Sequence, residues 1–229
     1  MDIYNNNTVP SKDVYDSFNN FMFSDDVKII GKLLYRYKFF DMTKDLPGDI
    51  VELGVFKGSG IATFSKFINI FCHHSNKKVL GFDIFDTDEA KDVLQTYSHE
   101  DACTMNDVYN RVEKNELHIE SVMNNLKYST NFKLVKGDVS KTIPEYLKQN
   151  PGFRISLLYM DMDLETPTYQ SLRHLWERIL PGGVIVFDEY EYHAFSESNG
   201  VDKFLKEFNI QYEIKSTNFM APTAFLIKK

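Results

Sequence analysis

Four acidic residues follow two apolar runs in the second half of the chain. The runs span residues 155–160 and 183–187, and the acidic residues after them are Asp161, Asp163, Asp188 and Glu189. The stretch between the runs has the length of one crossover helix. We therefore expect two adjacent parallel strands whose carboxyl ends lie about 5 Å apart, which would bring the four side chains together.

These four carboxylates are candidate metal ligands. Carboxylates crowded into one cleft repel one another unless they are protonated or bind a cation. A ligand set made only of oxygen atoms favours a hard ion, Mg²⁺ or Ca²⁺, over zinc. The alternative is a set of solvated aspartates that cap the following helices, a role open to Asp163.

An earlier apolar run, residues 49–55, carries a second set of candidate residues. Gly54 and Gly58 permit a tight turn and a close approach of the backbone to a ligand, and the helix expected from residue 58 offers free N–H groups to an anion. A buried Glu52 needs a cationic partner. A ligand with both a carboxylate and an ammonium group meets both requirements. The spacing matches neither a GxGxxG dinucleotide motif nor a Walker loop.

Acidic residues also end the next two predicted strands, residues 79–85 and 132–137. Asp83 lies about 30 positions after the glycines, a spacing that suits a ribose diol. Asp83 or Asp138 alone is more simply explained as a solvent-facing aspartate at a strand end. Three acidic strand ends in register, however, describe a nucleoside that carries an amino acid. The sequence therefore predicts S-adenosylmethionine as the cofactor.

Strands and helices alternate along the chain from residue 49 onward, which predicts a mostly parallel, doubly wound α/β sheet. Residues 211–216 and 223–227 are expected to add an antiparallel pair and so complete seven strands. Residues 1–46 form a predicted helical N-terminal extension. Residues 86–128 are too long for a plain crossover. They contain either a long lead-in to a helix at 107–127 or a lid over the site. No linker divides the chain, so we expect one domain over residues 1–229.

Composition excludes several functional classes. The chain has 229 residues, 43% of them hydrophobic, and a net charge of −7, which argues against nucleic-acid binding. No apolar stretch is long enough for a membrane helix, and residues 1–10 lack the features of a signal peptide. Two cysteines without metal-like spacing favour a reducing, cytoplasmic compartment.

The chain resembles the macrocin O-methyltransferase family, metal-dependent class I methyltransferases that act on sugar hydroxyls. Three stretches carry the resemblance: VELGVFKGSG at 51–60, YMDMDLETPTYQSLRHLWERILPGGVIVFDEY at 159–190 and GVDKFLKEF at 200–208. The resemblance implies a Rossmann-like class I methyltransferase sheet. It also implies that the methionine and ribose parts of the cofactor are held by Glu52, Gly54, Ser59 and Asp83, and the adenine by Asp138.

For the metal, the resemblance implies Mg²⁺ held by Asp161, Asp188 and Glu189. The family usually has Asp-Asp-Tyr after the fifth strand, whereas this chain has a longer glutamate at the second of these positions. Asp163 is the implied general base. His193, a few residues beyond the metal-site strand, is a second candidate for the base or for a substrate contact, and an ordinary surface histidine is an equal alternative.

The predicted function is therefore methyl transfer from S-adenosylmethionine to a hydroxyl of a sugar or glycosylated small molecule. Catechol-type or phenolic acceptors suit the same site. A binding module that has lost catalysis is a further alternative, and the glycine pattern disfavours a nicotinamide dehydrogenase. The chain is rich in aromatic residues, and these, among them Phe18, Phe21 and Phe23, are expected either in the core or in a homodimer contact.

Overall fold

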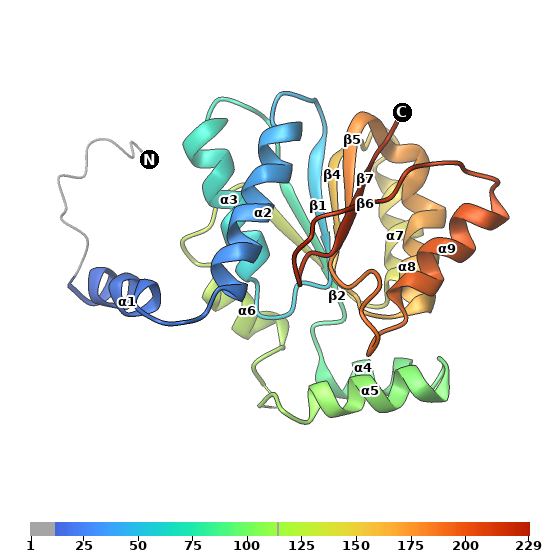
Figure 1. Ribbon diagram of the computed structural model, residues 1–229, viewed down its shortest axis with the longest axis horizontal. Coiled ribbons are helices and arrows are strands. Elements are labelled where there is room, and N and C mark those ends of the chain that lie inside the picture. The colour runs from blue at the N-terminus through green and yellow to red at the C-terminus, as the bar shows by residue number, and fades with distance from the viewer. Residues whose placement is uncertain (1–11, 114) are drawn as a thin grey trace.

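The computed structural model describes residues 12–113 and 115–229 and contains a seven-stranded sheet with helices on both faces (Figure 1). The five parallel strands are β1 (Asp49–Leu53), β2 (Val79–Asp83), β3 (Phe132–Lys136), β4 (Ile155–Met160) and β5 (Ile179–Phe187). Two short strands, β6 (Lys215–Ser216) and β7 (Ala224–Ile227), complete the sheet through antiparallel pairing. The strand order β3-β2-β1-β4-β5-β7-β6 confirms the predicted doubly wound sheet.

The helices form two layers and a cover at one edge. Helices α2 (Lys28–Thr43), α3 (Ser59–Phe71) and α6 (Ile119–Asn125) pack on one face, and α7 (Val139–Gln149), α8 (Glu165–Leu175) and α9 (Glu197–Glu207) pack on the other (Figure 1). Helices α4 (Thr87–Leu94) and α5 (His99–Tyr109) lie beyond the carboxyl ends of the strands (Figure 1). Helix α1 (Lys12–Met22) projects from the body and contains no buried residue.

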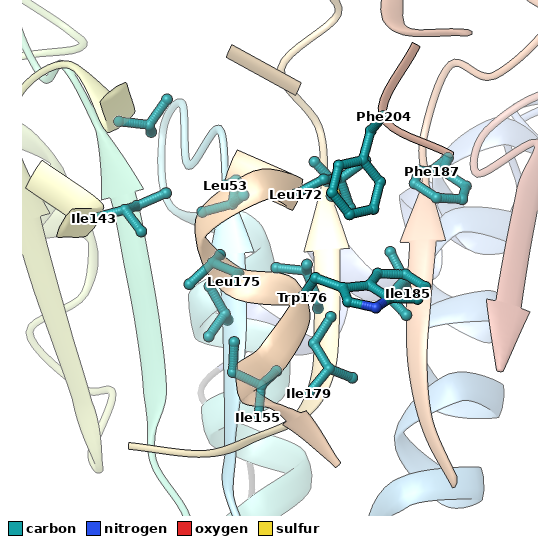
Figure 2. Packing of buried hydrophobic residues seen from close by; sticks show 14 of the residues in the cluster. Leu53, Ile143, Ile155, Leu172, Leu175, Trp176, Ile179, Ile185, Phe187 and Phe204 are labelled. Carbon is teal, nitrogen blue, oxygen red and sulfur yellow. The ribbon is translucent and has the colours of Figure 1, made fainter. Parts of the chain in front are cut away.

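Apolar side chains on both faces of the sheet fix its position between the helices. Figure 2 shows Trp176, in the short 3₁₀ turn after α8, and Phe204 of α9 packed over Ile185 and Phe187 of β5. The opposite face carries a second cluster built around the aromatic rings of α2 and α3. All six residues of β4 are buried, as expected for a central parallel strand.

The described part of the N-terminal extension, residues 12–46, forms two helices rather than one continuous helix. Residues 23–27 separate α1 from α2, and Asp26 accepts a hydrogen bond from the backbone N–H of Ile29 at 2.9 Å at the start of the second helix. Residues 1–10, where we predicted no signal peptide, lie outside the described residues. None of the described helices is long and apolar enough to cross a membrane.

The helix predicted over residues 107–127 is wrong in its extent. Helix α5 begins earlier and ends at Tyr109, and α6 starts only at Ile119. The intervening chain is held locally: Glu116 accepts a hydrogen bond from the N–H of Glu113 and pairs with Lys57 at 2.8 Å. Residue 114 is outside the described residues. Both α4 and α5 thus fall in the segment that we considered as a possible lid.

We predict that Gly200→Ala separates α8 from α9 and lowers the free energy of unfolding. A methyl group at Gly200 would lie 2.5 Å from the carbonyl oxygen of Glu165 and 2.9 Å from Cβ of Thr168. The two helices would have to move apart, at a cost of about 1–3 kcal/mol. Gly152→Ala is the matched control, because nothing lies within 4 Å of the added methyl, and it should stay within about 0.5 kcal/mol of wild type in urea titrations. Equal stability of the two variants would contradict the close packing of α8 on α9.

Candidate active site

A cavity of about 310 Å³ opens at the carboxyl ends of the parallel strands. Its walls come from the strand ends, from α2 and from the α4–α5 segment, which lies across this edge of the sheet (Figure 1). The polar residues that line it are Lys32, Arg36, Glu52, Ser59, Asp83, Asp138, Asp161 and Asp163. Tyr97, Met105 and Tyr109 supply apolar surface from the α4–α5 segment. The cavity is therefore charged on the side of the strand ends and α2, and largely apolar on the side of the α4–α5 segment.

The first wall is the turn from β1 into α3. Gly54 has φ +84°, and a Cβ atom there would clash with the backbone carbonyl of Asp161. Gly58, at φ +91°, occupies the N-cap position of α3, where no described side chain caps the helix. Glycine is required at the first of these positions, because the β1 turn touches the chain leaving β4. The following Ser59 lines the cavity.

Glu52 is buried beneath this turn and contacts a cation that the sequence did not reveal. Nη2 of Arg36, on α2, lies 3.3 Å from Oε1 of Glu52. Burial raises the pKa of Glu52 to about 7, and the Arg36 charge opposes that rise. Oε2 of Glu52 has no hydrogen-bond partner among the described residues. A buried, unpaired carboxylate oxygen beside the cavity fits an added cation, such as the ammonium group of an amino acid.

Asp83 and Asp138 both line the cavity and both have backbone partners. Oδ2 of Asp83 accepts hydrogen bonds from the N–H groups of Val55 and Phe56, at 2.8 and 2.9 Å, so it shapes the β1 turn. Burial raises the pKa of Asp83, and these hydrogen bonds lower it. Asp138 caps α7 by accepting a hydrogen bond from the N–H of Ser140 at 2.9 Å. Oδ1 of Asp83 also accepts a hydrogen bond from the N–H of Phe85 at 3.1 Å, so backbone donors occupy both of its oxygens. Asp138 retains acceptor capacity for a ligand hydroxyl or amine, because a carboxylate has about four acceptor sites.

The ends of β4 and β5 are neighbours, as predicted, because Met160 pairs with Phe187 in the sheet. Asp161 and Asp188 follow these two residues directly. Nζ of Lys32, on α2, lies 2.8 Å from Oδ2 of Asp161 and 2.7 Å from Oδ2 of Asp188. Two carboxylate oxygens thus converge on one cation.

Further contacts fix Asp188 in place. The hydroxyl of Tyr159 donates a hydrogen bond to its Oδ1 at 2.6 Å. Burial raises the pKa of Asp188 to about 6 and the negative charge of Asp161 adds to the rise, while Lys32 and Tyr159 lower it. Both oxygens of Asp188 are therefore engaged, one by a neutral donor and one by an ammonium group.

Glu189 does not join Asp161 and Asp188 around a common point. Within the described part of the chain, no group of three or more acidic, histidine or cysteine side chains is arranged to hold a metal ion. The backbone N–H of Glu189 donates to Oε2 of Glu197 at 2.8 Å, and Glu197 is fully buried at the start of α9. The donor set still fits Mg²⁺, which is commonly held by one or two carboxylates and completes its coordination with water or substrate oxygens.

Asp163 lines the cavity beside this cluster. Its backbone has φ +65°, and its carbonyl accepts a hydrogen bond from the N–H of Ser196 at 3.0 Å. Burial raises the pKa of Asp163 well above the usual range, and the charges of Asp161 and Glu189 raise it further. Leu164, and not Asp163, occupies the N-cap position of α8. The structure therefore leaves the Asp163 carboxyl available to the cavity.

The structure does not bring His193 to the cavity. Its side chain is exposed in the turn between β5 and α9 and is not among the cavity-lining residues. Four residues of the site were not predicted from the sequence: Lys32, Arg36, Tyr159 and Glu197. Lys32 and Arg36 are four residues apart on an otherwise apolar stretch of helix, so they share one face. Two cations on one helix face, in a chain with four carboxylates that need a counter-charge, could have indicated that this helix contacts the acidic site.

Comparisons with known proteins agree with this architecture. The structure is similar to that of CalS11, described as a TDP-rhamnose 3'-O-methyltransferase of calicheamicin biosynthesis, with a TM-score of 0.70 and 22% identity over 97% of this chain and 88% of CalS11. It is also similar to the O-methyltransferase NovP, with a TM-score of 0.71 and 20% identity over 86% of this chain and 79% of NovP. An O-methyltransferase from Bacillus cereus in complex with SAH gives a TM-score of 0.57 and 10% identity over 94% of this chain and 89% of that protein. At these identities the likeness shows the fold.

Sequence comparison provides the family. A search of curated protein sequences gave no match. The model of the macrocin O-methyltransferase family, TylF, matches residues 41–223, which include every strand end described above. The chain therefore belongs to the TylF macrocin O-methyltransferase family.

Proposed function

We propose that the protein transfers the methyl group of S-adenosylmethionine to a hydroxyl of a sugar or glycosylated small molecule, with the help of Mg²⁺. The observation that carries this proposal is the gathering of Asp161, Asp163 and Asp188 beside a cavity that also contains Glu52 and Asp83. The residues that would bind the cofactor and the acidic residues line the same cavity. Such an arrangement suits transfer of a group from a bound nucleoside to a deprotonated oxygen.

The cofactor would lie along the ends of β1, β2 and β3. Its amino group would meet the unpaired oxygen of Glu52, and its carboxylate would meet the backbone at Gly54 and Ser59. Asp83 would accept from the ribose hydroxyls, and Asp138 lies where the adenine would be. S-adenosylmethionine supplies an electrophilic methyl group on a positively charged sulfur. The α4–α5 side chains that cover the cavity would exclude water from this group.

Asp161 and Asp188 would hold the metal ion, with Glu189 as a third ligand if its side chain turns inward. Mg²⁺ lowers the pKa of a hydroxyl that binds to it. Asp163 would then take the hydroxyl proton, because its carboxyl lines the cavity beside Asp161. The acceptor oxygen would be held in line with the sulfur–methyl bond, and this positioning provides much of the acceleration.

The family and the TDP-rhamnose methyltransferase activity of CalS11 favour a sugar acceptor, including a nucleotide-linked one. A homodimer is also part of the proposal. Its support is the apolar surface exposed on α1 and on the turn that follows it, where Tyr15 and Phe18 are each 59% exposed and Phe23 is 82% exposed. A cytoplasmic location remains a prediction from the sequence.

We predict that methyl transfer requires a divalent ion. Purified enzyme should transfer labelled methyl groups from S-adenosylmethionine to at least one member of a panel of nucleotide-linked sugars and glycosides that includes TDP-rhamnose. EDTA should abolish transfer and Mg²⁺ should restore it, while S-adenosylhomocysteine binding survives EDTA. Asp161→Ala should stay inactive in excess Mg²⁺, because it loses a ligand. Full activity in metal-free enzyme would refute the metal requirement.

The same panel separates the alternatives. Transfer to catechols or phenols alone would replace the sugar acceptor with an aromatic one. Binding of S-adenosylhomocysteine without transfer to any acceptor would indicate a binding module.

We also predict that Asp163→Asn lowers kcat by roughly a hundredfold or more, because the amide cannot accept the hydroxyl proton. Affinities for S-adenosylhomocysteine and Mg²⁺, measured by calorimetry, should be nearly those of wild type. His193→Ala is the comparison variant and should retain activity, since its side chain is exposed outside the cavity. A normal kcat in Asp163→Asn together with a large loss in His193→Ala would assign the base to the histidine.

A further inference from the structure

The Lys32 ammonium group occupies a defined position between two strand ends. It makes contacts of 2.8 and 2.7 Å with Asp161 and Asp188, which themselves belong to β4 and β5 ends 27 positions apart in the chain. The side chain of Asp188 is 1% exposed, and those of Lys32 and Asp161 are 23% and 22% exposed. The contact is therefore largely shielded from water, where opposite charges attract strongly and like charges repel strongly.

A divalent ion held by Asp161 and Asp188 would use the same two carboxylates that Lys32 contacts through their Oδ2 atoms. Mg²⁺ binds oxygen at about 2.0–2.1 Å and requires near-ideal geometry. An ion held by both aspartates would need the carboxylates that Lys32 now contacts. The two cations would repel each other strongly at so short a distance, so they oppose each other's binding.

We propose that Lys32 and the divalent ion compete for Asp161 and Asp188, so that metal binding expels the lysine ammonium from the acidic cluster. The inference rests on the proposed function, since it concerns the metal of that reaction. Lys32 is a positioning residue in this account: in the metal-free protein it neutralises two carboxylates that would otherwise repel each other across the ends of β4 and β5.

Helix α2 gives this competition a second consequence. Arg36 lies one turn beyond Lys32 and contacts Glu52 in the cofactor cavity. Among the described residues that line the cavity, α2 carries the two cationic side chains, Lys32 and Arg36. Release of Lys32 would remove one of the polar contacts that hold α2 beside the cavity.

The test is calorimetric titration of MgCl₂ into four purified full-length proteins: wild type, Lys32→Met, Lys32→Gln and Lys28→Met. Lys32→Met removes the positive charge and keeps a side chain of nearly the same length. Lys32→Gln keeps hydrogen-bond donors for the aspartates and guards against a folding failure of the methionine variant. Lys28→Met is the matched control. Lys28 precedes Lys32 by one turn of α2 and acts on Glu189 through space, but among the described residues it has no bond to Asp161 or Asp188.

We expect both Lys32 variants to bind Mg²⁺ about tenfold or more tightly than wild type, because the binding-competent state no longer has to be created by displacing a cation. Lys28→Met should bind as wild type does. A thermal melt gives the second readout. Without metal the melting temperature of Lys32→Met should fall by several degrees, and Mg²⁺ should restore it more fully than it stabilises wild type.

Three outcomes would overturn the competition. Equal or weaker Mg²⁺ binding by the Lys32 variants would show that the lysine does not compete, while the proposed methyl transfer would stand. An equal increase in Mg²⁺ affinity in Lys28→Met would show that the effect arises from the loss of any nearby positive charge and not from direct competition by Lys32. Absence of Mg²⁺ binding in all four proteins would refute the competition and the metal requirement together, and methyl transfer in EDTA would then identify Lys32 as the resident cation.

Discussion

The site depends on neutralising carboxylates that the fold forces together. Parallel strands β4 and β5 end at the same edge of the sheet, and each is followed at once by an aspartate. Asp188 is almost completely buried, so its charge cannot be screened by water. An isolated buried charge costs several kcal/mol, so a cation must be present or the group must become neutral. Lys32 provides that cation in the structure.

Helix α2 therefore does more than cover one face of the sheet. Its Phe39 and Phe40 pack in the core, and its Lys32 and Arg36 contact the buried acids Asp188 and Glu52. The N-terminal extension is thus part of the site. The opposite wall comes from α4 and α5, whose aromatic residues close over the cavity. The cavity thus has charged side chains on the sheet side and apolar side chains from α4 and α5 on the opposite side.

Much of this arrangement could be predicted from the sequence, because strand ends in a parallel sheet have a fixed place. Once residues 49–53 and 155–160 were recognised as buried strands, Glu52, Asp161 and Asp163 had to lie at one edge. The glycine turn at Gly54 followed from the same reasoning. The helices of the 86–128 segment were predicted less well, since local caps and ion pairs decided where they end.

The partners of the acids could not be predicted in the same way. Lys32 is 129 and 156 residues away from Asp161 and Asp188, and nothing local indicates which lysine a distant acid will meet. Asp83 differed for another reason. Its carboxylate was expected to face a ribose, and it also binds two backbone N–H groups of the β1 turn, a contact that depends on the exact path of that turn. Hydrophobic periodicity in the sequence identifies helices and strands, but the partners of a buried side chain depend on how those elements pack.

The most direct test of the account is a crystal structure of the protein with S-adenosylhomocysteine and Mg²⁺ bound. The account predicts the nucleoside along the ends of β1, β2 and β3, with its amino group beside Glu52. It also predicts the ion between Asp161 and Asp188, where the Lys32 ammonium lies in the present structure. A nucleoside bound elsewhere, or an ion bound away from these aspartates with Lys32 still between them, would contradict it.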